Sequence, residues 1–197
     1  MNIGIDIDGV LTNIERMMID YGTKMCVDEK WPIKLNLNEY SVAKVFSWPE
    51  QTEEMFWNKY WIKYVTQTEP REHAPEIIEK LQQEGNKIYF ITARDNYGMP
   101  PEYYGKTEEL TKEWLKKNNI KYEKLIFAEN DEKLNQCFEN NIDIMIEDSP
   151  SNIDYMSKQI KMIKFDCSYN KHVNNKNVTT VYSWYHIYQI IEEMKKK

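Results

Sequence analysis

Short runs of β-branched and other apolar residues alternate along the chain with longer amphipathic segments. The runs predict buried strands at residues 2–7, Lys87–Ile91, Lys124–Phe127, Ile142–Ile146, Lys161–Phe165 and, more weakly, Val178–Val181. The segments between them predict helices at Pro75–Gln83, Thr107–Lys117, Glu132–Asn140, Ser151–Lys158 and Trp184–Lys195. Strands that alternate with helices of this length are typical of a parallel sheet covered on both faces. We therefore predict an α/β fold with a three-layer, Rossmann-like core.

One interval breaks this alternation. Between the first strand and the strand at Lys87–Ile91, the chain is much longer than a single crossover helix requires. Most of this interval has a helical pattern, with breaks near Trp31-Pro32 and Trp48-Pro49. It leaves the carboxyl end of the first strand, where open α/β sheets bind ligands. We therefore expect a core of residues 1–12 and 73–197 and a small helical cap of residues 13–72.

Composition narrows the class of protein. Of the 197 residues, 41% are apolar and 29% charged, which is typical of a globular chain. No apolar run approaches the ~20 residues of a membrane helix, and the N-terminus lacks a signal peptide's pattern, so we expect a cytoplasmic protein without membrane contacts. The net charge of −6 argues against binding nucleic acid. Three widely spaced cysteines (Cys26, Cys137 and Cys167) argue against disulfides and zinc and predict buried thiols.

Candidate chemistry begins where the first strand ends. Asp6 and Asp8 lie two residues apart and are followed by Gly9, so both carboxylates can face one spot. Two acids placed in this way repel unless a cation lies between them, and Mg²⁺ prefers such oxygen ligands. An aspartate can also attack phosphorus, while a second acid protonates the leaving oxygen and later activates water. Alone, this short motif is a weak signal, because strand ends often carry aspartate in turns.

Further polar residues are expected at the same sheet edge. Thr92 ends the second core strand, and Glu147-Asp148 ends the fourth. Lys133 opens the helix before that fourth strand and can neutralise phosphate or carboxylate charge. Each residue has an ordinary structural explanation when taken alone. Their convergence on one edge is what indicates a phosphate-handling site.

These residues, in this chain order, resemble the haloacid dehalogenase superfamily of phosphotransferases. The matching stretches are DIDGVLT from Asp6, ITAR around Thr92, Lys133, and IDIMIEDSPSN, which contains Glu147 and Asp148. Within the superfamily, the chain is similar to the 5′(3′)-deoxyribonucleotidase group and its bacterial nucleotidase relatives, nearly from end to end. The acid at position 8 fits the phosphatases of the superfamily and not its dehalogenases.

The resemblance implies a role for each matching residue. Asp6 would be the nucleophile and a Mg²⁺ ligand, and Asp8 the general acid and base, with its backbone carbonyl on the metal. Thr92 and Lys133 would hold the phosphoryl group. Asp148 would be the third protein ligand of Mg²⁺, with Glu147 behind it or acting through water. Relatives often have Asp-Asp where this chain has Glu147-Asp148, which leaves the division of roles between these two residues open.

Aromatic residues are concentrated in the expected cap. Between Phe46 and Tyr64 lie seven of them, and four have the spacing of one helical face: Trp57, Tyr60, Trp61 and Tyr64. That stripe is typical of a helical core. We therefore expect base stacking from the aromatics off the stripe, Phe46, Trp48 or Phe56. Arg94 is a candidate for phosphate or sugar binding, with a structural salt bridge as the alternative. Residues 95–106 form a long connection beside the site, either a lid or simply a mobile loop.

The leading hypothesis is a Mg²⁺-dependent nucleotidase that dephosphorylates (deoxy)nucleoside monophosphates. A phosphatase for a sugar phosphate or another small ester is the nearest alternative. A phospho-aspartate signalling module would also combine acids, a threonine and a lysine over a parallel sheet, but its accepting aspartate lies on a later strand. A catalytically idle binding protein is a further class, which the intact Asp6–Asp8 pair argues against. The expected partners are a small phosphate ester and a second copy of the chain in a homodimer.

Overall fold

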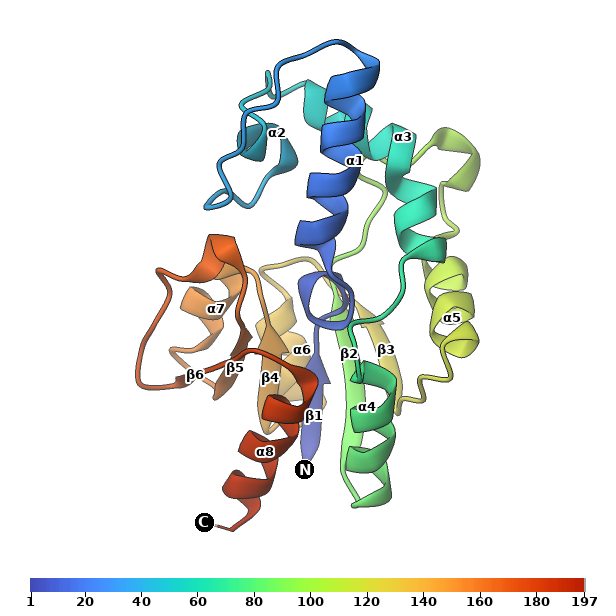
Figure 1. Ribbon diagram of the computed structural model, residues 1–197. Helices are drawn as coiled ribbons and strands as arrows, with labels where there is room; N and C mark the ends of the chain where they lie inside the picture. Colours follow the sequence, from blue (N-terminus) through green and yellow to red (C-terminus); the bar gives the residue numbers. More distant parts are fainter. Residues whose placement is uncertain (197) are drawn as a thin grey trace.

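A computed structural model describes residues 1–196 and contains one six-stranded sheet in which every neighbouring pair is parallel (Figure 1). The strands are β1 (Asn2–Ile5), β2 (Lys87–Thr92), β3 (Lys124–Phe127), β4 (Ile144–Glu147), β5 (Met162–Phe165) and β6 (Val178–Val181). Their spatial order is β3-β2-β1-β4-β5-β6, so β1 lies between β2 and β4. The predicted parallel α/β core is confirmed.

Eight α-helices accompany the strands within residues 1–196. They are α1 (Ile14–Asp28), α2 (Val42–Val45), α3 (Thr52–Gln67), α4 (Ala74–Gln83), α5 (Thr107–Lys117), α6 (Lys133–Glu139), α7 (Pro150–Met156) and α8 (Trp184–Lys195). Three short turns of helix complete the chain: η1 (Ile7–Leu11), η2 (Pro101–Tyr103) and η3 (Ser168–Asn170). The first strand is two residues shorter than predicted, because the chain leaves the sheet at Asp6 and turns into η1.

Apolar side chains on the two faces of the sheet form separate clusters. Successive residues of β2 alternate between them, with Ile88 and Phe90 on one face and Tyr89 and Ile91 on the other. The first cluster includes side chains of α4, α5 and α8, and the second includes side chains of α6 and α7. The sheet is therefore the middle of three layers.

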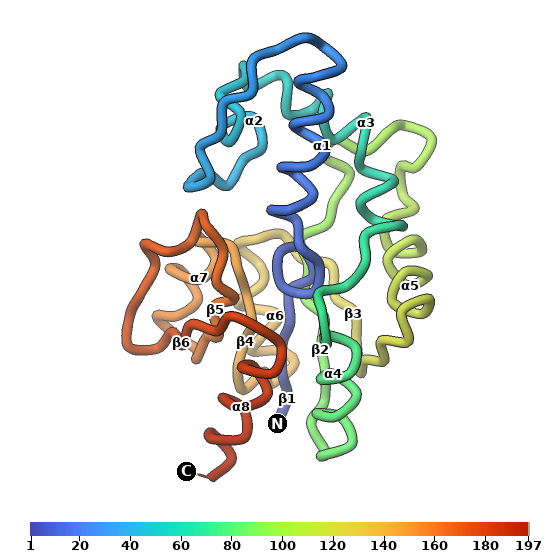
Figure 2. Tube along the Cα trace, in the orientation of Figure 1, coloured from blue at the N-terminus to red at the C-terminus, as the bar shows by residue number. Residues whose placement is uncertain are grey.

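Helices α1, α2 and α3 lie together beyond the carboxyl ends of the strands (Figures 1 and 2). Their buried faces form a third apolar cluster of their own. The long connection 95–106 also joins it, because Met99 is buried there. A Cβ added to Gly98 would lie 2.2 Å from the Cβ of Trp57, so this connection packs closely against α3. It is therefore not a free loop in this structure.

The two ends of the helical insertion (residues 13–72) lie side by side. Thr12 and Pro70 form an antiparallel bridge, and the Arg71 amide donates to the Leu11 carbonyl over 2.8 Å. The Arg71 guanidinium also donates to the carbonyls of Gly9 and Thr12. These bonds tie the exit of the insertion to its entrance. On this ground we propose to keep the division into residues 1–12 with 73–197 and residues 13–72.

The cysteines Cys26, Cys137 and Cys167 are free and buried, as their spacing predicted. Burial raises the pKa of the Cys137 and Cys167 thiols to about 12. None of the helices in residues 1–196 is both long enough and apolar enough to cross a membrane.

Candidate active site

Asp6 occupies the position directly after β1, at the carboxyl edge of the sheet. Its amide donates to the Ile146 carbonyl of β4 over 2.9 Å, which fixes the residue between two strands. Its side chain is buried, and its Oδ1 accepts a hydrogen bond of 2.6 Å from Lys133 Nζ. The same ammonium donates to Glu147 Oε2 over 2.9 Å. The structure therefore brings together three residues that the sequence analysis assigned to one site.

Charge in this buried group is unevenly balanced. Burial raises the pKa of Asp6 above its ordinary value, and the positive charge of Lys133 offsets this only in part. Burial alone would lower the pKa of Lys133, but Asp6 and Glu147 hold it above its usual range. Burial likewise acts to raise the pKa of Glu147, yet Lys133 and two backbone amides hold it below its ordinary value. The single positive charge of Lys133 is thus shared by two buried carboxylates, and it fully compensates the charge of only one of them, Glu147.

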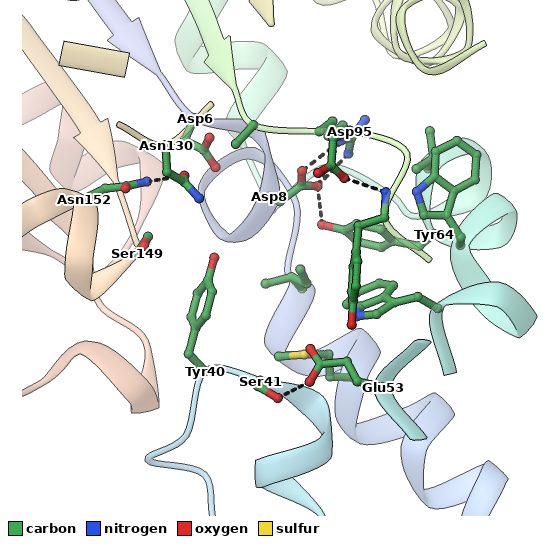
Figure 3. A pocket seen from close by; sticks show the side chains of 18 of the residues that line it. Asp6, Asp8, Tyr40, Ser41, Glu53, Tyr64, Asp95, Asn130, Ser149 and Asn152 are labelled. Carbon is green, nitrogen blue, oxygen red and sulfur yellow. Dashed lines mark hydrogen bonds and ion pairs between the residues drawn. The ribbon is translucent and has the colours of Figure 1, made fainter. Parts of the chain in front are cut away.

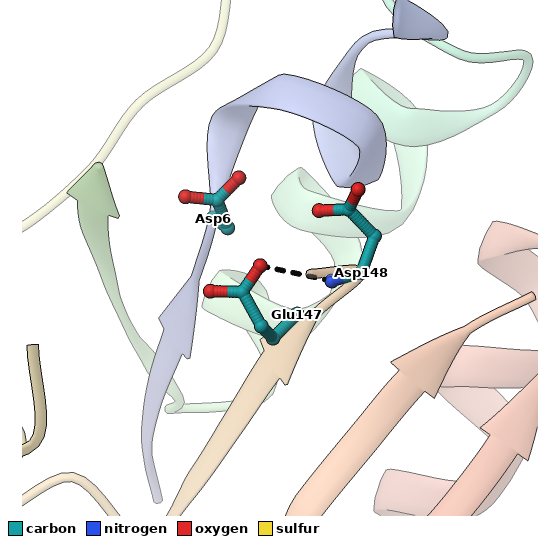
Figure 4. A group of neighbouring side chains, drawn as sticks. All are labelled: Asp6, Glu147 and Asp148. Carbon is teal, nitrogen blue, oxygen red and sulfur yellow. Dashed lines mark hydrogen bonds between the residues drawn. The ribbon is translucent and has the colours of Figure 1, made fainter. Parts of the chain in front are cut away.

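Both oxygens of Glu147 are occupied by protein donors. Oε1 accepts from the amide of Asp148 (Figure 4) and from that of Ser149, each over 3.0 Å. Oε2 accepts from Lys133 and, over 3.1 Å, from the Asn152 side chain. With these donors in place, Glu147 is a support for its neighbours rather than an open ligand.

Asp148 has the opposite character. Its Oδ2 accepts a short hydrogen bond from the Tyr169 hydroxyl, and its carbonyl accepts one from Asn170, so the residue is held from two sides by η3. Its Oδ1 is buried and has no hydrogen-bond partner among residues 1–196. Burial, together with the charges of Glu147 and Asp6, raises the pKa of Asp148 well above its usual range. An unpaired buried carboxylate oxygen is costly unless it binds something.

The carboxylates of Asp6, Glu147 and Asp148 form a compact acidic group at the sheet edge. One oxygen from each lies within 4.8 Å of the others, and all three residues are buried (Figure 4). Carboxylate oxygens are the ligands of hard cations such as Mg²⁺. The unpartnered Oδ1 of Asp148 and the undercompensated Asp6 are the two groups that a cation would satisfy. The donor set therefore suits Mg²⁺ and contains no sulfur or imidazole.

The turn η1 brings Asp8 back over the sheet edge. Gly9 adopts φ +98°, a conformation that other residues rarely take. A Cβ added there would lie 2.1 Å from Asp148 Oδ2. Glycine at this position therefore permits both the turn and the close approach of Asp148.

Asp8 is held by two residues from distant parts of the chain, Arg94 and Tyr64. Arg94 donates to both of its oxygens, with distances of 2.7 Å and 2.9 Å for the shortest contact to each. The Tyr64 hydroxyl of α3 donates to Oδ1 over 2.5 Å (Figure 3). Burial would raise the pKa of Asp8, but Arg94 and Tyr64 together hold it below its ordinary value. The sequence analysis considered phosphate or sugar binding and a structural salt bridge for Arg94, and in the structure Arg94 forms a salt bridge with Asp8.

Thr92 lies where it was expected, as the buried last residue of β2. Its hydroxyl accepts a hydrogen bond of 3.3 Å from the Arg94 amide. It is absent from the residues that line the neighbouring cavity. Its proposed hold on a phosphoryl group therefore stays a prediction.

A cavity of about 270 Å³ lies between the sheet edge and the helical insertion (Figure 3). Its lining combines carboxylates and cations at the sheet with aromatic and apolar residues of the insertion. The lining residues are Asp6, Asp8, Ile14, Met18, Tyr40, Ser41, Glu53, Trp57, Trp61, Tyr64, Val65, Ala93, Arg94, Asp95, Tyr97, Asn130, Lys133, Glu147, Ser149 and Asn152.

The expected base-stacking residues Phe46, Trp48 and Phe56 do not line this cavity. Phe46 and Phe56 are fully buried in the cluster of the insertion, and Trp48 stacks on Phe46 with ring centroids 4.5 Å apart. Their assignment to substrate is therefore corrected. Three rings of the helical stripe reach the cavity instead, those of Trp57, Trp61 and Tyr64 on α3, and Tyr40 and Tyr97 line it from outside the stripe.

Several residues of the site were not assigned by the sequence analysis. The helical stripe correctly predicted that the ring of Tyr64 is buried. The spacing of the stripe does not show that the Tyr64 hydroxyl reaches Asp8. Tyr169 and Asn170 lie in η3, outside any motif, and bind Asp148 from there. Asn152 is part of the recognised stretch IDIMIEDSPSN, which is the one signal that pointed to it.

Comparison with known proteins identifies the family. A family model described as 5′ nucleotidase, deoxy (pyrimidine), cytosolic type C protein matches residues 1–197. A nucleotidase of Clostridium acetobutylicum is 28% identical over 200 residues, which cover 100% of this chain and 96% of the relative.

Solved structures share the fold. A structure described as a predicted phosphatase from Clostridium acetobutylicum has a TM-score of 0.65 at 15% identity and covers 98% of each chain. The D,D-heptose 1,7-bisphosphate phosphatase of B. bronchiseptica has a TM-score of 0.58 at 7% identity, again over 98% of each chain. The chain therefore shares the fold of a solved haloacid dehalogenase superfamily hydrolase, belongs to the 5′ nucleotidase, deoxy (pyrimidine), cytosolic type C family, and is a phosphoric monoester hydrolase.

Proposed function

We propose that the protein is a Mg²⁺-dependent nucleotidase that hydrolyses (deoxy)nucleoside monophosphates in the cytoplasm. One observation carries this proposal: a single cavity holds the carboxylates and Lys133 at one end and the rings of Trp57 and Trp61 on its walls. Flat aromatic rings bind nucleobases by stacking and tolerate different bases. The family description, with its reference to cytosolic nucleotidases, supports the same substrate class and location.

Asp6 is the proposed nucleophile. Its carboxylate attacks phosphorus, a bond forms between an Asp6 oxygen and phosphorus, and the ester bond to the leaving oxygen breaks. Asp8 supplies a proton to the leaving oxygen. It then takes a proton from water as that water attacks phosphorus and releases phosphate from Asp6. Lys133 and Thr92 are proposed to hold the transferred phosphoryl group.

Asp8 has to leave its salt bridge for the first of these proton transfers. Because Arg94 and Tyr64 hold the pKa of Asp8 low, the residue is suited to act as a base, but in this arrangement it is a poor acid. Movement of the Arg94 guanidinium from Asp8 to the substrate phosphate would release the acid form. We therefore propose Arg94 as a substrate contact as well as the structural partner of Asp8.

Mg²⁺ is the proposed cofactor. Asp6 and Asp148 would hold it with their carboxylates and Asp8 with its backbone carbonyl, while Glu147 keeps Asp148 and Lys133 in position. Bound there, Mg²⁺ would neutralise charge on the phosphoryl oxygens. The phosphatase of B. bronchiseptica with the same fold is described as a complex with magnesium and phosphate, which supports this cofactor.

The alternative substrate is a sugar phosphate or another small ester. The aromatic walls favour a nucleotide over such an ester. The signalling alternative is dropped, because membership of the family makes the chain a phosphoric monoester hydrolase. A homodimer stays a prediction.

Initial rates of phosphate release over a panel of substrates test the proposed function. With Mg²⁺ present, we expect kcat/KM for deoxynucleoside 5′-monophosphates to exceed that for ribose 5-phosphate and fructose 6-phosphate by about tenfold or more, since stacking of the base is absent in the sugars. A chelator should abolish all of these activities. Equal or faster turnover of the sugar phosphates would overturn the nucleotide assignment.

Replacing Tyr169 by phenylalanine is expected to weaken Mg²⁺ binding about tenfold, because outer partners of metal ligands typically contribute this much. The variant keeps the buried ring but removes the hydroxyl that orients Asp148. Calorimetric titration with Mg²⁺ measures the effect directly. The exposed Tyr155→Phe is the matched control, and an unchanged Kd in Tyr169→Phe would contradict a positioning role for the hydroxyl.

A further inference from the structure

The cavity contains more negative groups than positive ones. Its lining carries five carboxylates, Asp6, Asp8, Glu53, Asp95 and Glu147, against the two cations Arg94 and Lys133. Both cations are already bonded to carboxylates of the sheet edge: Arg94 to Asp8, and Lys133 to Asp6 and Glu147. The cations therefore gather at the end of the cavity where the phosphate is proposed to bind.

Glu53 lies at the other end. It belongs to the first turn of α3 in the helical insertion, and Figure 3 shows its carboxylate beside Ser41, away from Asp6. Ser41 Oγ donates a hydrogen bond to its Oε2. Within residues 1–196, no lysine, arginine or histidine forms an ion pair with Glu53, and its Oε1 accepts no hydrogen bond. This carboxylate thus has acceptor capacity and an uncompensated charge.

We propose that Glu53 is a specificity-determining residue for the part of the substrate that does not react. It favours phosphate monoesters whose other end is neutral and offers an N–H or O–H donor, and it disfavours substrates that carry a second phosphate. The inference rests on the proposed function only in that the cavity must be the substrate pocket. It does not depend on whether the substrate is a nucleotide or a sugar phosphate.

The physical reason is electrostatic. A single phosphate at the sheet edge meets Lys133, Arg94 and the proposed cation. A second phosphate toward the insertion meets the carboxylate of Glu53, with no free cation among the lining residues. In a partly enclosed cavity, like charges a few ångströms apart repel far more than in bulk water. A neutral donor, by contrast, gains a hydrogen bond to a charged acceptor.

Replacing Glu53 by glutamine tests the proposal with two pairs of substrates. The pairs are thymidine 5′-monophosphate with thymidine 3′,5′-bisphosphate, and fructose 6-phosphate with fructose 1,6-bisphosphate. For each pair, the readout is the ratio of kcat/KM for the bisphosphate to that for the monophosphate. We expect Glu53→Gln to raise this ratio about tenfold, at least in the pair whose monophosphate the wild-type protein hydrolyses better. The substitution removes the repulsion between Glu53 and the second phosphate and keeps the shape of the side chain.

Glu54→Gln is the matched control, since it removes the same charge from the next residue of α3, which is exposed and does not line this cavity. It should leave the ratio unchanged. If Glu53→Gln is poorly folded by circular dichroism, Glu53→Ala serves the same comparison. Ratios that agree among wild type, Glu53→Gln and Glu54→Gln would overturn the role of Glu53. Failure of the wild type to hydrolyse any monophosphate would instead overturn the proposed function, so the two failures are distinguishable.

Discussion

Replacing Asp6 by asparagine is expected to lower kcat by about 10³-fold or more, because the amide cannot attack phosphorus and essential nucleophiles typically carry losses of this size. The fold should be retained. Asparagine has nearly the same shape as aspartate, and its oxygen can still accept the hydrogen bond from Lys133. Burial already disfavours the charged form of Asp6, so loss of the charge should not lower the melting temperature in the absence of metal.

Steady-state phosphate release and thermal unfolding of the same preparation measure the two parts of this prediction. Asp131→Asn is the control, because Asp131 is exposed and lies outside the cavity. Its kcat should equal that of the wild type. An Asp6→Asn protein with wild-type turnover would contradict the proposed mechanism, whatever its stability.

Replacing Lys133 by methionine is expected to lower the free energy of unfolding by about 3–5 kcal/mol, the usual cost of removing one partner from a buried ion pair. The substitution leaves Asp6 and Glu147 buried side by side without the cation that bridges them. Methionine fills a similar volume, so the loss reports charge rather than a cavity. Urea unfolding in the presence of a chelator gives the value without interference from bound metal.

Lys112→Met is the corresponding control. Lys112 pairs with Glu108 on the exposed surface of α5, where solvent screens such a pair and it contributes little to stability. A loss in Lys133→Met no larger than that in Lys112→Met would mean that Lys133 does not compensate the buried carboxylates.

The core was predictable because its signals are local. Helices α5 and α8 have the predicted bounds, since amphipathic spacing and helix-terminal residues act within a few turns. The meeting of Asp6, Lys133 and Glu147 was also predictable. Carboxyl ends of parallel strands share one edge, so residues far apart in the chain are brought together by topology alone. The end of the first strand before Asp6 was not predicted, because Ile7 continues the apolar run.

The contacts across the cavity were not predictable in the same way. Helical spacing identified one apolar face of α3. Apolar side chains, however, form both the interior of the insertion and part of the cavity wall, so the spacing does not show which side chain belongs to which. Phe56 is buried inside, and Trp57 reaches the cavity, although they are adjacent in sequence. The bond from Tyr64 to Asp8 depends on how the insertion folds back over the sheet edge. That arrangement is set by packing between segments more than fifty residues apart.

The proposed mechanism requires a covalent bond between Asp6 and phosphorus. This bond can be trapped by mixing the Mg²⁺-loaded protein with a 5′-nucleotide labelled with ³²P in its phosphate and quenching in acid within a single turnover. If Asp6 is the nucleophile, radioactivity is expected on the peptide that contains Asp6, hydroxylamine should release it, and Asp6→Asn should carry none. Formation of nucleoside with no label on the protein at any time, or label on a peptide without Asp6, would mean that Asp6 is not the nucleophile.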